Sequence, residues 1–123
     1  RPPPHRMPTL RDLVQTLVRR PGVSAALVFG RDGLLVETAG MERPAAEPLA
    51  ALAPGLLAGA DAIGRSTGRG PLVTAILEHA DALAVLATLT SDVSLLVLLT
   101  PGADAGATVR ELRRARAGLA ALV

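Results

Sequence analysis

A nearly unbroken apolar run from Ala82 to Thr100 restricts the folds that are open to this chain. It is interrupted near its middle by Thr90-Ser91-Asp92. As a membrane helix, the run would place Asp92 near the bilayer centre, at a cost of about 2.5 to 3.5 kcal/mol on insertion scales. Two strands, Ala82 to Leu89 and Val93 to Leu99, joined by a short turn, avoid that cost. Because both strands are almost continuously apolar, we expect helices to cover both faces of their sheet.

The N-terminal part of the chain predicts one helix followed by a hairpin. Thr9, followed three residues later by Asp12, resembles a capping box with Asp in place of Glu. Apolar residues then recur at helical spacing until Pro21-Gly22, which ends the helix. Val23 to Phe29 predicts a strand, and Gly30-Arg31-Asp32-Gly33 predicts the turn into a second one. The second strand consists of Leu34, Leu35, Val36 and Thr38.

An Ala- and Leu-rich run from about Pro44 to Ser66 predicts the longest helix. Pro48 fits a first helical turn, whereas Pro54 with Gly55 falls in the middle of the run and predicts a kink or a split. Small side chains leave part of the surface of this helix shallow. That surface either permits close packing on the sheet or admits a helix from a second subunit. We expect one face to carry Leu49, Leu52, Leu56 and Ile63, and the shallow surface to carry Ala50, Ala53, Gly59 and Ala60.

The C-terminal half completes the order of elements. After a break at Gly68 to Pro71, Leu72 to Glu78 predicts a strand, and His79-Ala80-Asp81 is short enough to make a hairpin with the next strand. A final helix, capped by Asp104 or Thr108, is expected to reach Val123. A chain of 123 residues has room for one packed core. We therefore expect one α+β domain over residues 7–123 and a disordered tail over residues 1–6.

The composition excludes several classes of function. The chain contains no Cys and no Lys, which rules out thiolate chemistry, the P-loop lysine and Schiff-base catalysis. His5 and His79 lie in the expected tail and in a turn, without neighbours at metal-ligand spacing. Asp32, Asp81 and Asp92 fall in turns, where a carboxylate caps its own backbone. We therefore expect no enzyme activity, no metal and no cofactor.

Charge and targeting signals are similarly sparse. A formal net charge of +2 and a single aromatic residue, Phe29, argue against nucleic-acid binding. Arg110, Arg113, Arg114 and Arg116 can form a basic ridge on the last helix, for an acidic partner or membrane phosphates, but we favour a solvated helix face as their explanation. No secretory signal precedes the first helix, so we expect a cytoplasmic protein without direct membrane insertion.

The order and spacing of four segments resemble the roadblock/dynein light-chain family, in its bacterial MglB-type branch. The resemblance covers about residues 7 to 123. It implies a five-stranded antiparallel sheet with the long helix on one face and the terminal helices on the other, the order being α-β-β-α-β-β-β-α. The four segments are Pro21-Gly22-Val23, Gly30 to Val36, Leu49-Ala50-Ala51-Leu52 and Arg110 to Val123.

The resemblance also implies a homodimer, in which the third strands pair edge to edge and the long helices pack side by side. It implies a non-enzymatic regulator or scaffold that binds a Ras-like small GTPase in bacterial polarity, motility or signalling. Alternatives are a scaffold that leaves hydrolysis unchanged, with a sensor kinase as a candidate partner, and a small-molecule sensor domain. The expected dimer or partner interface comprises Leu49, Ala50, Leu52, Ala53, Leu56, Gly59, Ala60, Leu72, Thr74 and Ile76.

Overall fold

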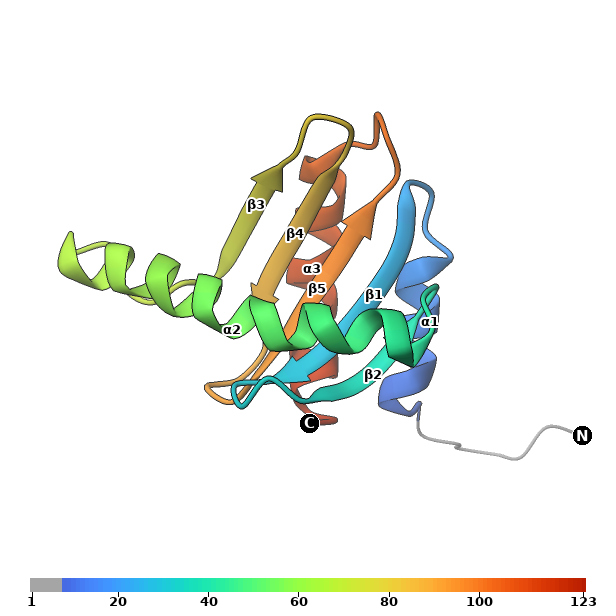
Figure 1. Cartoon of the computed structure of the whole chain (residues 1–123), viewed down its shortest axis with the longest axis horizontal. Helices are drawn as coiled ribbons and strands as arrows, with labels where there is room; N and C mark the ends of the chain where they lie inside the picture. Colours follow the sequence, from blue (N-terminus) through green and yellow to red (C-terminus); the bar gives the residue numbers. More distant parts are fainter. Residues whose placement is uncertain (1–7) are drawn as a thin grey trace, which may run out of the picture.

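The fold is an open five-stranded antiparallel sheet between two layers of helices (Figure 1). The computed structural model describes residues 8–123, so the expected tail and His5 lie outside the described residues. The strand order is β2-β1-β5-β4-β3, with α2 on one face and α1 and α3 on the other. The predicted order of elements is confirmed. The elements are α1 (Leu10–Val18), β1 (Val23–Gly30), β2 (Leu35–Ala39), α2 (Arg43–Ser66), β3 (Thr74–Glu78), β4 (Leu83–Thr88), β5 (Val93–Leu99) and α3 (Ala105–Ala120).

The centre of the sheet is buried on both faces. Along β1, Ala26 and Val28 face α1 and α3, whereas Leu27 and Phe29 face α2, and none of the four is more than 1% exposed. β5 pairs with β1 over its whole length, and its side chains alternate between the two faces of the sheet in the same way. The expectation of helices on both faces is therefore confirmed, and the Ala82 to Thr100 run forms two strands.

Local signals in the sequence fix several element ends as predicted. The capping box of α1 forms: the Asp12 N–H donates to Thr9 Oγ1 at 3.1 Å, and the Thr9 N–H donates to the Asp12 carboxylate at 2.9 Å. Asp104 is the N-cap of α3, since its carboxylate accepts the Gly106 N–H at 2.8 Å. In the β1–β2 turn, Gly33 adopts a φ of +83°, which favours glycine.

α2 excludes a split at Pro54 and corrects the expected position of Pro48. The helix is unbroken from Arg43 to Ser66, so Pro54 does not split it, and Pro48 lies beyond the first turn, which contains Pro44 instead. A proline inside a helix costs about 3 kcal/mol through its lost hydrogen bond and its ring contacts. Packing of the helix on the sheet, on both sides of Pro54, offsets that cost because most helical stability in proteins comes from such packing.

Three alanines and Leu57 hold α2 against the sheet, and of the predicted aliphatic face only Leu49 packs against that core. Ala46 and Ala50 are fully buried and Ala53 is 7% exposed, whereas Leu52 is 72% exposed. Alanine side chains let the helix backbone approach the strands closely, over Leu27, Leu86 and Leu96. Of the two interpretations of the shallow surface, close packing on the sheet therefore applies to Ala50 and Ala53.

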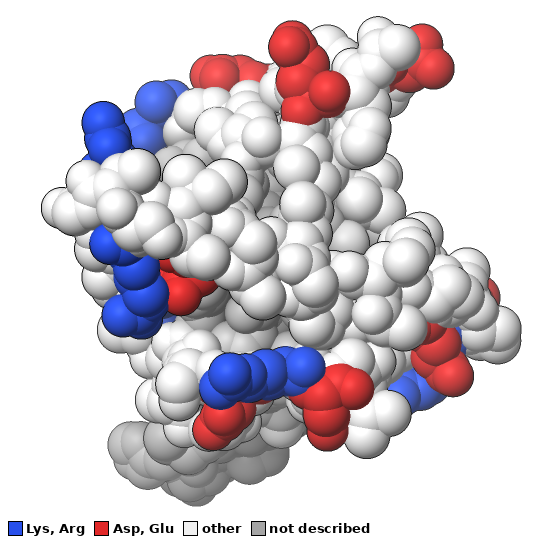
Figure 2. Space-filling view, turned by 60° about the vertical axis from the view of Figure 1, so that its left-hand side comes forward, with Lys and Arg blue, Asp and Glu red and all other residues white. Residues whose placement is uncertain are grey.

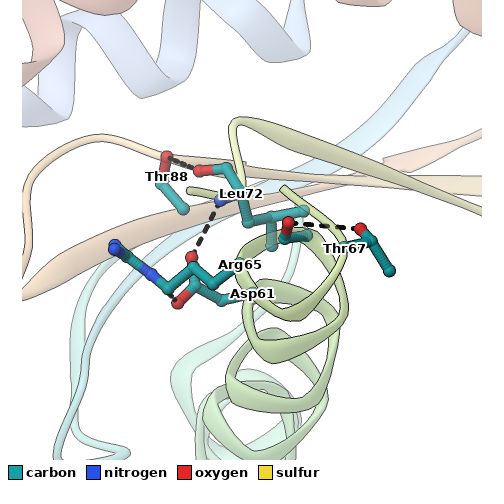
Figure 3. A network of polar contacts seen from close by, with 6 residues as sticks. Asp61, Arg65, Thr67, Leu72 and Thr88 are labelled. Carbon is teal, nitrogen blue, oxygen red and sulfur yellow. Dashed lines mark hydrogen bonds and ion pairs between the residues drawn. The ribbon is translucent and has the colours of Figure 1, made fainter. Parts of the chain in front are cut away.

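A polar network joins the C-terminal half of α2 to the start of β3 (Figure 3). Asp61 accepts the Leu72 N–H at 2.8 Å through Oδ1 and the Arg65 Nε–H at 2.7 Å through Oδ2. The Leu72 carbonyl in turn accepts the Thr88 hydroxyl at 3.1 Å. The Leu72 N–H, and after it Arg65, lower the pKa of Asp61 below its ordinary value of 3.8. The network fixes the position of α2 relative to β3, the edge strand of the sheet.

Replacing Ala50 by Leu should lower the free energy of unfolding by about 1 to 3 kcal/mol, because the site has no room for the added carbons. The matched control is Ala45→Leu, since Ala45 is exposed on the same helix and its replacement should change stability by less than about 0.5 kcal/mol. Urea unfolding followed by circular dichroism at one protein concentration measures both. Equal stability of the two variants would contradict the packing described for α2.

Asp61→Asn should destabilise the protein at pH 7 and flatten its acid dependence. A carboxylate whose pKa is lowered by folding contributes stability above its unfolded pKa of 3.8 and loses it as the pH falls through the lower folded pKa. The stability difference between the parent protein and the variant should thus be constant above about pH 5 and shrink below about pH 4.

Urea unfolding at a series of pH values measures this difference. Asp81→Asn is the control, because it removes the same charge from the exposed β3–β4 turn. A difference between the parent protein and Asp61→Asn that stays the same at pH 3 and pH 7 would show that the carboxylate charge is not what stabilises the joint.

Candidate interaction surface

The outer face of α2 carries a stripe of exposed aliphatic side chains. Leu52 is 72%, Leu56 46% and Ile63 68% exposed. With Gly59 between them, these residues follow i, i+4, i+7 and i+11 spacing and therefore lie on one side of the helix. A Cβ added at Gly59 would meet no atom within 4 Å, so the stripe has a notch in its middle. We call Leu52, Leu56, Gly59 and Ile63 the α2 stripe.

The stripe lies beside an open edge of the sheet. β3 is the last strand, it pairs only with β4, and an edge strand leaves alternate backbone N–H and C=O groups free for another strand. Ile76 of β3 is 53% exposed and faces away from α2, opposite Val85. Figure 1 shows that α2 crosses the sheet and that its C-terminal end extends beyond β3, with no strand of this chain beneath it.

The two edges of the sheet differ in how they are protected. At β2, the Arg43 guanidinium donates to the Leu35 carbonyl at 3.3 Å, so the chain itself satisfies part of that edge. At the β3 edge, no side chain of the described residues bonds to the backbone of Thr74–Glu78. Figure 2 shows the side of the molecule with β3 and the end of α2: its middle is hollowed and uncharged, and charged residues lie towards its margins.

The structure distributes the predicted interface residues over three environments. Ala50 and Ala53 are buried against the sheet of their own chain and do not lie on the free surface. Ile63 and Val73, which is 44% exposed, belong to the surface although they were absent from the predicted interface. The spacing of Ile63 from Leu52 and Leu56 is the signal that points to it. The other predicted residues are exposed (Leu52, Leu56, Gly59 and Ile76) or partly buried (Leu49, Ala60, Leu72 and Thr74).

Two of the four α3 arginines, Arg110 and Arg114, lie near carboxylates. Arg110 lies 3.9 Å from the Asp104 carboxylate, and Arg114 lies 3.7 Å from Glu111. Glu111 also accepts a hydrogen bond of 2.6 Å from Arg20, which ties α3 to the end of α1. The Arg110–Asp104 pair is largely exposed and contributes little to stability, whereas Glu111 is only 23% exposed. The exposure of Arg110 and Arg114 agrees with the interpretation of this helix face as solvated.

The described part of the chain offers few groups for metal or covalent chemistry. Residues 8–123 contain no group of three or more His, Cys, Asp or Glu side chains that could hold a metal ion. His79 is exposed in the turn between β3 and β4, as expected. Among the same residues, no helix has both the length and the hydropathy needed to span a bilayer.

Solved structures share this architecture. A Roadblock/LC7 domain from Streptomyces avermitilis is 28% identical and superposes with a TM-score of 0.83, over 91% of this chain and 95% of that one. MglB from Myxococcus xanthus has the same fold at 18% identity, with a TM-score of 0.83 over 92% of this chain and 93% of its own. The gliding protein MglB from Thermus thermophilus does so at 18% identity, with a TM-score of 0.81 over 92% of this chain and 87% of its own.

Sequence comparison agrees with the fold. No match was found among curated proteins. The family model of the Roadblock/LC7 domain matches residues 9–99, which include every element from α1 to β5. The predicted family resemblance is therefore confirmed, and the chain belongs to the Roadblock/LC7 domain family.

Proposed function

We propose that the protein is a non-enzymatic homodimer that binds a Ras-like small GTPase and modulates its GTPase cycle. Membership of the Roadblock/LC7 family supports the regulatory role, and the resemblance of the sequence to this family implies the class of partner. MglB, called a gliding protein in one of the similar structures, supports bacterial motility or polarity as the process. The observation that carries the proposal is the exposed α2 stripe beside the open β3 edge.

A second copy of this chain fits that surface best. In a twofold dimer the same patch contacts itself, so two β3 edges can pair antiparallel and continue the sheet across both subunits. Each projecting end of α2 then covers the neighbouring subunit, and the notch at Gly59 lets the two helices approach closely. Fully burying a Leu or Ile side chain stabilises by about 1.5 to 3 kcal/mol, so removing the α2 stripe from water favours this arrangement.

Leu52→Arg should convert the dimer into a monomer, because a twofold interface would bring two like charges into an apolar contact. Sedimentation equilibrium should give the mass of one 12.6 kDa chain for the variant and twice that mass for the parent protein. Leu34→Arg is the matched control: Leu34 is 67% exposed but precedes β2, at the opposite edge of the sheet, so its replacement should leave the dimer intact.

Ile76→Arg tests the strand part of the interface independently and should also weaken the dimer. Far-ultraviolet circular dichroism checks that each variant is folded. If the protein with Leu52→Arg and Ile76→Arg combined is folded and still dimeric, the second copy does not dock on this surface.

Binding of a small GTPase is tested with tagged protein and native extract, in the presence of GDP or a non-hydrolysable GTP analogue. Mass spectrometry should find a small GTPase enriched in one nucleotide state. We expect the monomeric Leu52→Arg variant to lose that enrichment and the Leu34→Arg variant to keep it, because the partner is proposed to recognise the dimer. Absence of any small GTPase in both nucleotide states would contradict the proposal.

Measured GTP turnover then separates regulation from simple scaffolding. The purified GTPase is assayed alone and with a saturating amount of the dimer. A change in the hydrolysis rate supports modulation of the cycle, whereas an unchanged rate with confirmed binding would favour the alternative, a scaffold without effect on hydrolysis.

A further inference from the structure

A cavity of about 740 Å³ opens at the end of the sheet where β4 ends and β5 begins. One wall is apolar and consists of Pro54, Leu57 and Ala58 of α2 together with Leu72. The polar lining comes from the β1–β2 and β4–β5 turns and from α3, together with Asp61 and Arg65 of α2 and Thr88 of β4. Small-molecule sites typically have volumes of about 300 to 1,000 Å³ and combine apolar walls with a few polar groups. The cavity has both properties.

The polar side of the cavity is held in place by its own hydrogen bonds. The Arg31 N–H donates to the Asp92 carbonyl at 2.7 Å, which fixes the β1–β2 turn against the β4–β5 turn. The Thr90 hydroxyl accepts the N–H groups of Asp92 and Val93 at 3.2 and 3.1 Å and so fixes the second turn. The site is therefore formed by tied turns before any ligand enters, which lowers the ordering cost of binding.

Three arginines from separate elements line this cavity: Arg31, Arg65 and Arg116. Arg65 is paired with Asp61 at 2.7 Å. Arg116 donates only to a neutral group, the Thr88 hydroxyl, at 3.0 Å. The Arg31 side chain makes no hydrogen bond or ion pair within residues 8–123. Two guanidinium charges are therefore left without an ion-pair partner among these residues.

The remaining groups in the cavity set the sign of the charge that it favours. Asp61 is already neutralised by Arg65 and by the Leu72 N–H, so Asp92 is the one carboxylate of the described residues that opposes Arg31 and Arg116. The hydroxyls of Ser91 and Ser94 also line the cavity, and neither is bonded within residues 8–123. Guanidinium and hydroxyl donors together match the oxygens of a phosphate group.

We propose that this cavity binds a small organic phosphate, with the phosphate at Arg31 and Arg116 and an apolar body against Pro54 and Leu57. The volume exceeds what a bare phosphate ion needs, and the apolar wall gives no hydrogen bonds to one. The groups proposed to hold the phosphate belong to the turns and to α3, whereas Leu72 and Val73 carry the other end of the cavity to the start of β3.

The probe is 1-naphthyl phosphate, titrated into the complete chain and followed by the amide NMR signals of the β4–β5 turn. Two comparison compounds separate the parts of the site: 1-naphthol lacks the charge, and inorganic phosphate lacks the apolar body. We expect 1-naphthyl phosphate to shift the amides of Asp92 and Ser94 at lower concentration than either comparison compound does. Equal or stronger binding of 1-naphthol, or of inorganic phosphate, would overturn the proposal.

Charge variants give a test that a merely apolar site would fail. Removing one charge about 5 Å from a bound phosphate in a partly solvated site changes Kd by about three- to tenfold. Arg31→Gln should raise Kd by that factor, and Asp92→Asn should lower it. Arg113→Gln is the matched control, because Arg113 is an exposed arginine of α3 that does not line the cavity.

The pattern across the three variants decides the outcome. Weaker binding in Asp92→Asn than in the parent protein would mean that the site prefers cations or neutral polar groups, and would overturn the proposal. Equal weakening by Arg31→Gln and Arg113→Gln would show attraction to the overall charge rather than to this cavity, and would also overturn it. Unchanged chemical shifts away from the substituted residue confirm that each variant keeps its fold.

Discussion

The structure depends on the pairing of β1 with β5 at the centre of the sheet. Both strands are apolar on both faces, so neither can be stable in water until helices cover each side. α1 and α3 cover one face, and α2 covers the other. The three layers also account for the close contact of the α2 alanines with the sheet. β3 stays open because no further strand of the sheet lies beyond it.

The two sides of α2 have opposite roles. Towards the sheet, alanines allow the helix backbone to approach the strands closely. On the other side, Leu52, Leu56 and Ile63 expose an aliphatic surface of the kind that marks an interaction site. The aliphatic side of an amphipathic helix normally faces the core of its own chain. Here the side that faces the core consists of three alanines and Leu57, while three large aliphatic side chains are exposed, and this arrangement supports a second copy as their cover.

The α2 stripe and the cavity lie on different sides of the same helix. Leu57 lines the cavity, while Leu56, its neighbour in sequence, belongs to the stripe. Asp61 joins the two regions, because it bonds to Leu72 at the start of the edge strand and also lines the cavity. A ligand in the cavity would therefore contact the same joint that positions α2 over the β3 edge.

Sequence by itself determined the element order, the hairpins, the α1 capping box and the helices on both faces, because apolar period, turn residues and caps are local signals. It also placed Leu52, Leu56 and Ile63 on one side of a helix. Only the tertiary structure decided which side of α2 faces the sheet, since periodicity groups residues on a face without saying what covers it. The same holds for the cavity: Arg31, Arg65 and Arg116 are far apart in sequence, and only the folding of two turns and two helices to one end of the sheet brings them together.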